Sequence, residues 1–452
     1  MYTTPIAHQL IGRRPRDLGD GLILRSARQG DGSELADFNA AMHADADMAA
    51  STLADWTRDL FESPHPTFRA ERDVTVVEDS ATGRIVSALF LIPQFWSYAG
   101  VPMAVGQPEL IATHPAYRRR GLVRSQFGVV HEWSRAAGHL WQFISGIPWY
   151  YRQFGYAYAI DLPSRPVHWL GENAPAASTE YSLRAATPTD VAFLAEIEAQ
   201  ATSGTALGPT RGPEGFALEL ARRPGALTAC KVLVVESHVS GAQPVGYVAH
   251  HGRLRDGLVS VRAFELRRGQ HWLGPTAAVV FHLHVWVRSH PDGPGRGIRF
   301  ALPDGHPAIR SAATRLGSGP PGTYALYVRV PDVIAVLRAV ASVLESRLAA
   351  SPADGWTGDL RIDLYNAGIH LHFEEGRLEL IEPWVAPDGD GVNEPGADAS
   401  LRLDEFVPLL VGNRSVHDLE RATADFLVHT DTGALLLDVL FPAMPTSTWE
   451  FC

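Results

Sequence analysis

The sequence has only two cysteines and no long apolar run, and both absences limit what the protein can be. Cys230 and Cys452 lie far apart and form no CxxC or Cys/His spacing, so they indicate neither a disulfide framework nor a structural zinc site. A reducing cytoplasm fits this usage. Residues 1–20 are polar and lack the apolar centre of a signal peptide, and no stretch of about 18 apolar residues occurs elsewhere. We therefore expect a soluble, cytoplasmic protein that does not use a membrane.

Length and charge set two further limits. A chain of 452 residues suggests about three domains, and a hydrophobic content of 46% is enough to fill several cores. The sequence has 39 Lys and Arg residues against 50 Asp and Glu residues, which gives a net charge of −11. This balance argues against binding to nucleic acid and mildly favours cationic, amine-bearing substrates through long-range attraction.

The rest of the chain is organised around a basic turn at residues 117–124, Tyr-Arg-Arg-Arg-Gly-Leu-Val-Arg. An extended apolar run at residues 110–112 precedes the turn, and apolar residues at helical spacing follow it from Val123 to Val130. A helix entered in this way directs its unpaired backbone N–H groups, and the positive end of its dipole, at whatever lies in front of it. Three arginines add charge, and Gly121 removes the Cβ where a pyrophosphate would approach the backbone. The pattern therefore predicts a phosphate cradle.

A second motif follows this helix. Residues 139–144 are predicted to form a strand, and residues 149–156 read Trp-Tyr-Tyr-Arg-Gln-Phe-Gly-Tyr. Together the two motifs resemble the acyl-CoA-binding core of the GNAT N-acetyltransferases, whose pyrophosphate loop reads Arg/Gln-x-x-Gly-x-Gly/Ala. Arg118 and Gly121 match the first two fixed positions, and Val123 replaces the final small residue. More narrowly, the Arg-Arg-Arg-Gly-Leu run followed by Tyr-x-x-Phe-Gly-Tyr resembles the enhanced intracellular survival (Eis) acetyltransferases.

Short internal echoes indicate a duplicated unit. Residues 24–27 recur at 183–186, residues 74–78 recur at 232–236, and Glu109-Leu110 recurs as Glu265-Leu266, all at nearly the same offset. The second copy has no Arg-x-x-Gly-x-small loop after Glu265-Leu266. We therefore predict that the second copy is degenerate and supplies walls and interface.

The last third of the chain has a different predicted order of strands and helices from the two preceding units. Three strands are predicted, at 359–365, 368–374 and 377–382, and short helices are predicted near 404–412, 416–426 and 433–440. This arrangement resembles a sterol-carrier-protein-2-like (SCP2-like) domain, which is the third part of the Eis architecture. The resemblance thus implies a mixed α/β (α+β) chain of tandem GNAT folds and an SCP2-like domain. The expected parts are an N-terminal arm at 1–20, a catalytic GNAT domain at 21–165, a degenerate GNAT domain at 181–325, and an SCP2-like domain at 326–452 whose C-terminal tail returns to the active site.

The resemblance implies acetyl-CoA as co-substrate. Backbone groups of the strand before the basic turn would pair with the pantetheine arm, and N–H groups of the turn would hold the pyrophosphate. The predicted cofactor-binding residues are Ile111, Ala112, Thr113, Arg118, Arg119, Arg120, Gly121, Leu122, Val123 and Arg124.

Acetyl transfer to an amine requires a neutral nucleophile, a polarised thioester carbonyl and a proton for the leaving thiolate. By resemblance to Eis, Tyr151 protonates the coenzyme A sulfur, and the carboxylate of Cys452, the last residue of the sequence, is the base. Glu109 is the competing base, because it lies just ahead of the cofactor strand, where other GNAT branches place a carboxylate. As an alternative, Tyr151 is a core aromatic and Glu109 merely faces solvent.

Aromatic residues could line a pocket for a hydrophobic or cationic amine, and the candidates are Trp96, Trp149 and Tyr150. The same residues fit a protein core equally well. No metal is expected, because the pairs His282-x-His284 and His370-x-His372 lack a third ligand nearby.

We therefore expect an Eis-like N-acetyltransferase that acts on a primary amine of a small molecule or a lysine side chain, and that is a homo-oligomer, by resemblance a hexamer. The alternative is a non-catalytic protein: an SCP2-like carrier of apolar ligands, or a scaffold whose GNAT cores have decayed. The sequence does not name the acceptor.

Overall fold

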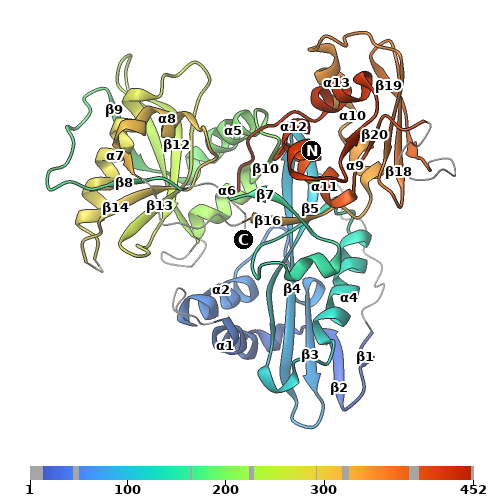
Figure 1. The fold of residues 1–452 in the computed structure, drawn as a ribbon. Coiled ribbons are helices and arrows are strands. Elements are labelled where there is room, and N and C mark those ends of the chain that lie inside the picture. Colours follow the sequence, from blue (N-terminus) through green and yellow to red (C-terminus); the bar gives the residue numbers. More distant parts are fainter. Residues whose placement is uncertain are drawn as a thin grey trace.

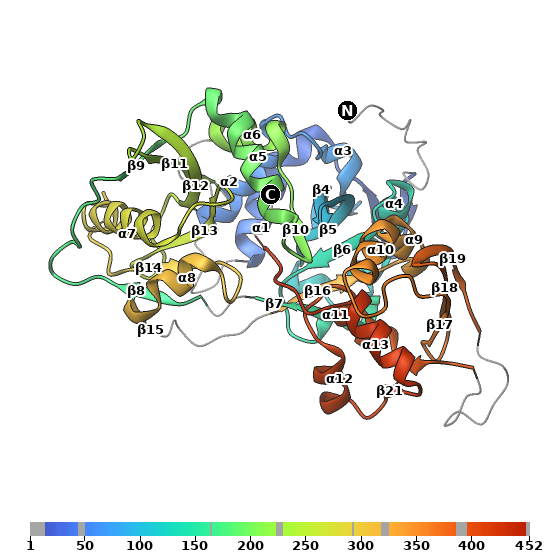
Figure 2. The same ribbon diagram turned by 90° about the horizontal axis from the view of Figure 1, so that it is seen from above.

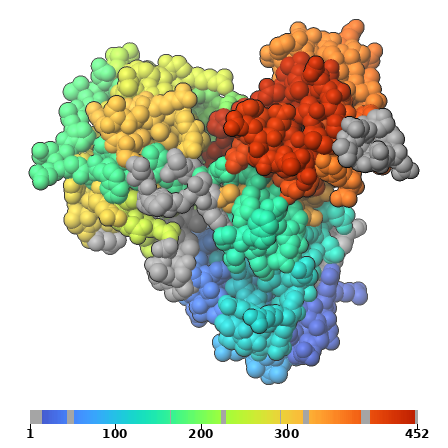
Figure 3. All heavy atoms as spheres, in the orientation of Figure 1, coloured from blue at the N-terminus to red at the C-terminus, as the bar shows by residue number. Residues whose placement is uncertain are grey.

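Three β-sheets, each with its own helices, organise the chain (Figure 1). The computed structural model describes residues 14–43, 50–162, 165–222, 229–291, 293–317, 325–385 and 396–448. Viewed from above, the second and third sheets lie on opposite sides of the first (Figure 2). The space-filling view shows the second unit, in green and yellow, and the third, in orange and red, side by side above the first, in blue and cyan (Figure 3). None of the described helices combines the length and apolar character needed to cross a membrane.

The first sheet has nine strands among the described residues, in the order β1-β2-β3-β4-β5-β6-β16-β7, with β10 pairing to β4. Its strands are β1 (Arg16–Asp17), β2 (Leu22–Ser26), β3 (Val74–Asp79), β4 (Arg84–Tyr98), β5 (Val101–Thr113), β6 (Trp141–Ile144), β7 (Ala157–Asp161), β10 (Leu207–Pro209) and β16 (Ala325–Arg329). Its helices are α1 (Gly32–His43), α2 (Ala50–Glu62), α3 (Ala70–Asp73) and α4 (Leu122–Ala136). Within the predicted N-terminal arm, β1 pairs with β2, so residues 16–17 belong to the sheet; residues 1–13 lie outside the described part.

Alternate strand residues cover the two faces of this sheet. Val74 and Val76 pack with α1 and α2 on one face, whereas Val77 packs with α4 on the other. The predicted helix after the basic turn is α4, in which Phe127 and Val130 are buried. Both helix layers therefore fix the position of β4 and β5, the strands that lead to the basic turn.

β16 belongs to the first sheet, although it follows the second unit in the chain. The sequence predicts this strand as the start of the third part, but Tyr327 and Val328 pair with β6 and β7 instead. The sheet is therefore completed by residues more than 160 positions beyond β7 in the chain.

The second unit repeats an ion-pair arrangement of the first. The Arg25 guanidinium donates to Asp31 at 2.6 Å and to Glu78 at 2.7 Å, and the Arg184 guanidinium donates to Asp190 at 2.8 Å and to Glu236 at 2.7 Å. The sheet order is β15-β8-β14-β13-β12-β11-β9. Its elements are β8 (Val167–Trp169), β9 (Tyr181–Ala185), α5 (Val191–Thr202), α6 (Gly212–Ala221), β11 (Cys230–Ser237), β12 (Gln243–His251), β13 (Leu258–Leu266), α7 (Leu273–Arg288), β14 (Gly297–Phe300), α8 (Pro307–Ala312) and β15 (Leu316–Gly317).

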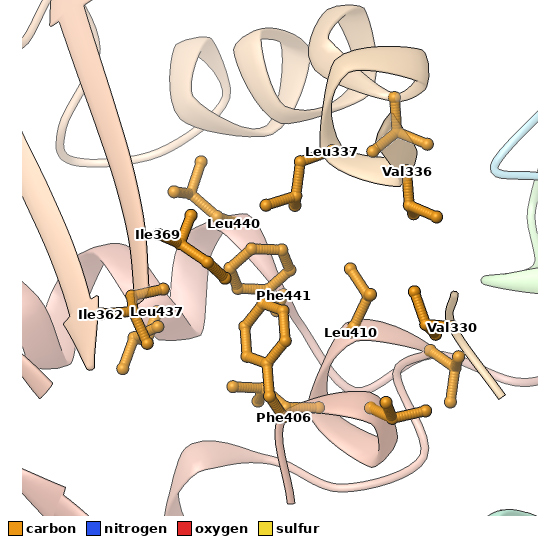
Figure 4. Close-up of a cluster of buried hydrophobic side chains, with 14 of the residues drawn as sticks. Val330, Val336, Leu337, Ile362, Ile369, Phe406, Leu410, Leu437, Leu440 and Phe441 are labelled. Carbon is orange, nitrogen blue, oxygen red and sulfur yellow. The ribbon is translucent and has the colours of Figure 1, made fainter. Parts of the chain in front are cut away.

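Among the described residues, the third unit contains the three strands and three helices that the sequence analysis predicts, together with four further elements, α9, α10, β20 and β21. Its sheet order is β19-β18-β17-β20-β21. The elements are α9 (Val333–Ala339), α10 (Ala341–Ala349), β17 (Gly358–Asp363), β18 (Gly368–Glu374), β19 (Arg377–Pro383), β20 (Ala399–Ser400), α11 (Leu403–Leu410), α12 (Val416–Ala422), β21 (Leu427–Val428) and α13 (Asp431–Leu440). Phe406 and Phe441 meet edge to face at 5.4 Å in its centre, surrounded by aliphatic side chains (Figure 4). The same hydrophobic core continues into the first unit through Trp141 and Phe143.

Candidate active site

The basic turn forms an uncapped helix N-terminus. Arg119 and Gly121 both have left-handed backbone conformations, with φ of 65° and 76°. Gly121 is the N-cap of the 15-residue helix α4 and provides no side chain to bond the first N–H groups. Residues with a Cβ rarely adopt this conformation, so glycine is needed at position 121 for backbone geometry rather than for space. The N–H groups of the first turn of α4 are thus available to an anion.

The arginines of the turn have different surroundings. Arg118 Nε donates to the Thr113 carbonyl at 3.2 Å, which ties the turn to the end of β5. Arg124 donates to Gln153 at 2.7 Å. The Arg120 guanidinium lies 5.3 Å from the centre of the Tyr117 ring. Of the predicted cofactor-binding set, Arg120 is the residue that does not line the cavity in front of this turn.

A cavity of about 540 Å³ opens in front of this helix N-terminus. All predicted cofactor-binding residues except Arg120 line it, together with Tyr150 and Tyr151. Six further residues that were not predicted as site residues line it: Tyr117 of the basic turn, and Met42, His43, Ile147, Gln153 and Phe154. Gln153 and Phe154 lie inside the second motif and could have been proposed from it. Met42 and His43, at the end of α1, reach the cavity only through the packing of α1 on the sheet, which leaves no local signal in the sequence.

Behind the cavity, β5 has a bulge and separates from β6. The register of β4 and β5 shifts between Ala88 and Phe90, opposite Leu110, whose φ of 49° marks a bulge. Within residues 101–162, all of which are described, β5 pairs with β6 only at Val105 and Gly106. The stretch from Ile111 to Thr113 therefore lies along an open strand edge on the cavity, where backbone groups can pair with an extended ligand.

Tyr151 lies in the wall of the same cavity. It belongs to a short 3-10 helix, η3 (Tyr150–Phe154), and its side chain is buried with only 5% of the residue exposed. Its ring meets those of Phe127 and Tyr327 edge to face, at 6.2 and 5.4 Å. Gly146 has a φ of 127°, and a Cβ there would lie 3.4 Å from the phenol oxygen. The phenol and the helix N-terminus are thus brought together by residues about 30 positions apart in the chain.

The three aromatic residues predicted to line a substrate pocket lie in three different surroundings. Tyr150 lines the cavity, and burial raises the pKa of its phenol. Trp149 is 68% exposed and lies against the Arg152 guanidinium at 4.2 Å. Trp96 is fully buried, stacks on Phe143 at 4.3 Å, and belongs to the core rather than to a substrate-facing surface.

Glu109, one candidate base, ends a chain of amide hydrogen bonds. The Trp96 indole N–H donates to Gln94 at 3.0 Å, the Gln94 amide donates to Gln107, and the Gln107 amide donates to the Glu109 carboxylate at 2.9 Å. The half-buried carboxylate of Glu109 is therefore oriented by the Gln107 amide.

The other candidate base, Cys452, lies outside the described residues, but the chain leading to it is described up to Thr448. Ala206 N–H donates to the Pro445 carbonyl at 2.8 Å, and Ser447 N–H donates to the Leu207 carbonyl at 2.9 Å. The tail runs parallel to β10, which is antiparallel to β4. At Thr448 it is therefore heading along β4 toward the middle of the first sheet.

The counterpart of the cradle in the second unit has different surroundings. A Cβ on Gly274, near the start of α7, would lie 2.5 Å from the Tyr181 ring, so that ring packs directly against the backbone there. Pro275 removes one N–H from the first turn. Both features set the start of α7 apart from the start of α4. Among the described residues, no group of three or more His, Cys, Asp or Glu side chains is arranged to hold a metal ion.

Comparison with known protein families gives a match within the first unit. The family profile described as an acetyltransferase (GNAT) domain matches residues 24–159. No curated protein sequence matches the chain.

Three solved structures share the fold at low identity. The GCN5-related N-acetyltransferase from Kribbella flavida is 18% identical with a TM-score of 0.62, over 94% of this chain and 98% of that one. A conserved protein from Enterococcus faecalis V583, a probable N-acyltransferase, is 11% identical with a TM-score of 0.63, over 95% and 100%. Eis1 from Mycobacterium abscessus is 15% identical with a TM-score of 0.54, over 94% and 99%. Residues 24–159 are therefore a GNAT acetyltransferase domain within a mixed α/β chain, and the protein is an enzyme of the acyltransferase class.

Proposed function

We propose that the protein transfers the acetyl group of acetyl-CoA to a primary amine of a small molecule or a lysine side chain. One observation carries this proposal: the uncapped start of α4 and the Tyr151 phenol line the same cavity. A pyrophosphate bound at the helix start would leave the pantetheine arm to run along the open edge of β5 toward Tyr151. The acceptor itself is to be found by screening primary amines for release of free thiol.

The proposed chemistry assigns one task to each group. The amine nitrogen attacks the thioester carbonyl, the carbon–sulfur bond breaks, and Tyr151 gives its hydroxyl proton to the leaving thiolate. A base removes the proton that the nitrogen loses on acylation. We assign the base to the carboxylate of Cys452, because the tail at Thr448 already runs toward the first sheet and four extended residues span about 13 Å. Glu109 is the alternative.

The remaining parts of the proposal concern the whole chain. We propose a catalytic domain at 21–165, a degenerate domain at 181–325 and an SCP2-like domain at 326–452 in a cytoplasmic homo-oligomer, a hexamer by resemblance. The alternative role is carriage of apolar ligands by the third unit. Aromatic and aliphatic side chains fill the centre of that unit (Figure 4), so such a ligand would have to use the cavity of about 1400 Å³ that Leu364, Leu403 and Val407 line beside the first unit.

Acetyl-CoA binding is tested by a matched pair of variants in the basic turn. Arg119→Gln removes a charge that lines the cavity, and Arg120→Gln removes the neighbouring charge that faces Tyr117. We expect Arg119→Gln to weaken acetyl-CoA binding about 10-fold, the usual value of one charge-assisted phosphate contact. Arg120→Gln is expected to weaken it less than 3-fold. Both dissociation constants are measured by calorimetry at one salt concentration.

Two outcomes would contradict this assignment. If the native protein binds no acetyl-CoA, the protein is a carrier or scaffold rather than an acetyltransferase. If the two substitutions weaken binding equally, the pyrophosphate does not lie at the start of α4, and the arginines act only through general charge.

The base is tested by deleting Phe451 and Cys452 and, separately, by Glu109→Gln. Loss of a general base costs about 100-fold or more in kcat. We expect the deletion to cause that loss and Glu109→Gln to lower kcat less than 10-fold, with thiol release as the assay. Full turnover after the deletion would remove the C-terminal carboxylate from the mechanism and favour Glu109.

A further inference from the structure

We propose that Tyr158 and Tyr327 are positioning residues for Tyr151, joined by their hydroxyl groups into a clamp on the turn that carries it. This inference rests on the proposed function, because it concerns the residue assigned there as proton donor. The clamp consists of the two phenols and of the backbone groups of Ile147 and Trp149, and it depends on a strand that follows the second unit.

The hydrogen bonds of the clamp join two hydroxyl groups to two backbone groups of the turn. Trp149 N–H donates to the Tyr158 hydroxyl at 2.6 Å, the hydroxyls of Tyr158 and Tyr327 lie 2.5 Å apart, and the Tyr327 hydroxyl donates to the Ile147 carbonyl at 3.2 Å. A hydroxyl has a single hydrogen to donate. The Tyr327 hydroxyl faces two acceptors, the Tyr158 hydroxyl and the Ile147 carbonyl, and its single hydrogen is shared between them. Two side chains thus link the N–H and the C=O of one turn.

The turn needs this support because its backbone is unusual. Trp149 has a φ of 67°, a left-handed conformation that a tryptophan rarely adopts. Its side chain is 68% exposed, so burial of the indole does not hold the turn in place. Trp149 is the N-cap of the 3-10 helix η3, in which Tyr151 is the second residue. Any movement of the turn is therefore passed directly to the phenol of Tyr151.

Ring packing adds a second contact between the clamp and Tyr151. Tyr327 is fully buried, stacks on Tyr158 at 4.1 Å and meets the Tyr151 ring edge to face at 5.4 Å. Tyr158 and Tyr327 are also cross-strand partners of β7 and β16. The same residue of β16 therefore fixes both the turn before Tyr151 and the ring of Tyr151 itself.

The kinetic test compares Tyr158→Phe and Tyr327→Phe with Tyr98→Phe. Tyr98 is a fully buried phenol of the same sheet whose hydroxyl donates to the Leu410 carbonyl, away from the cavity, so its variant matches the loss of a buried hydrogen bond. We expect the two clamp variants to lower kcat 10- to 100-fold with acetyl-CoA affinity unchanged within 2-fold, and Tyr98→Phe to keep kcat within 2-fold. In a Tyr151→Phe background, the clamp substitutions are expected to cause no further loss. Unchanged kcat in both clamp variants, or a full further loss in that background, would overturn the proposal.

A second measurement does not depend on acetyl transfer. Amide hydrogen exchange of Trp149 reports its N–H bond to Tyr158 directly. We expect exchange at this amide to be at least 10-fold faster in Tyr158→Phe and unchanged in Tyr98→Phe. Fast exchange already in the native protein would show that the clamp is absent. If exchange behaves as expected but the native protein transfers no acetyl group, the clamp stands and the proposed function fails.

Discussion

Tyr151→Phe is expected to lower kcat about 100- to 1000-fold while leaving acetyl-CoA affinity within 2-fold of the native value. The substitution removes one hydroxyl and keeps the ring, so the edge-to-face contacts with Phe127 and Tyr327 remain. Without the hydroxyl, the leaving thiolate must take its proton from solvent, and loss of a general acid costs a factor of this size. Steady-state thiol release gives kcat, and calorimetry gives the affinity.

A decisive control is a substrate with a different leaving group. An acetyl thioester of a thiol with a much lower pKa needs little protonation as its sulfur departs, so Tyr151→Phe should slow its reaction far less than that of acetyl-CoA. If kcat for acetyl-CoA falls less than 5-fold, Tyr151 is a structural aromatic and the proton comes from elsewhere.

Acidification is expected to destabilise the protein strongly between pH 6.5 and pH 5, because several buried histidines resist protonation. Burial, with help from Arg222, Arg69 and Arg72, lowers the pKa of His65 from 6.5 to about 3. Burial lowers the pKa of His251 to about 3 and the pKa values of His250 and His131 to about 4, with nearby cations contributing in each case. The folded state thus keeps these four imidazoles neutral.

The direction of the pH effect on stability follows from the lowered pKa values of these histidines. The unfolded chain protonates these histidines near pH 6.5 and the folded chain does not, so their stabilising contribution is complete above pH 6.5 and is lost as pH falls toward 4. Each difference of one pKa unit corresponds to about 1.4 kcal/mol, which gives on the order of 1–2 kcal/mol per histidine at pH 5. The combined loss, on the order of 4–8 kcal/mol, should be visible as a large fall of the urea midpoint between pH 7.5 and pH 5.

His65→Gln provides the control for this prediction. His65 Nδ1 accepts the Phe68 N–H at 2.9 Å, a bond that a protonated ring cannot accept, so His65 is a strong contributor. The variant should be less stable at pH 7.5 but should lose less stability on acidification. An equally steep pH dependence in the variant would mean that His65 does not titrate with unfolding.

Local pattern was enough to predict the helices and strands near the basic turn and in the third unit. The helix after Gly121 and the strands β17, β18 and β19 of the third unit depend on apolar spacing and turn residues, which are legible in one segment of sequence. The place of β16 was not legible, because its continuous apolar run would fit an inner position of any sheet. Only the packing of Tyr327 between β6 and β7 decides which sheet it joins.

In the candidate site, too, local features could be predicted from the sequence and tertiary contacts could not. Gly121 and the arginines beside it could be proposed from sequence because a helix start is a local feature. The direction of Arg120 toward Tyr117 and the burial of Trp96 depend on neighbours from other strands, and the sequence alone did not reveal them. Met42 and His43 enter the cavity for the same tertiary reason.

The late position of β16 has a consequence for synthesis on the ribosome. At usual translation rates, the chain from β7 to β16 takes on the order of 10–30 s to emerge, and the acetyltransferase sheet stays open for that time. The second unit emerges in this interval and closes on itself, since β8 at its beginning pairs with β15 near its end. That closure returns the nascent chain to the place where it left the first sheet, so the second unit delivers the missing strand, and with it Tyr327, to the waiting site.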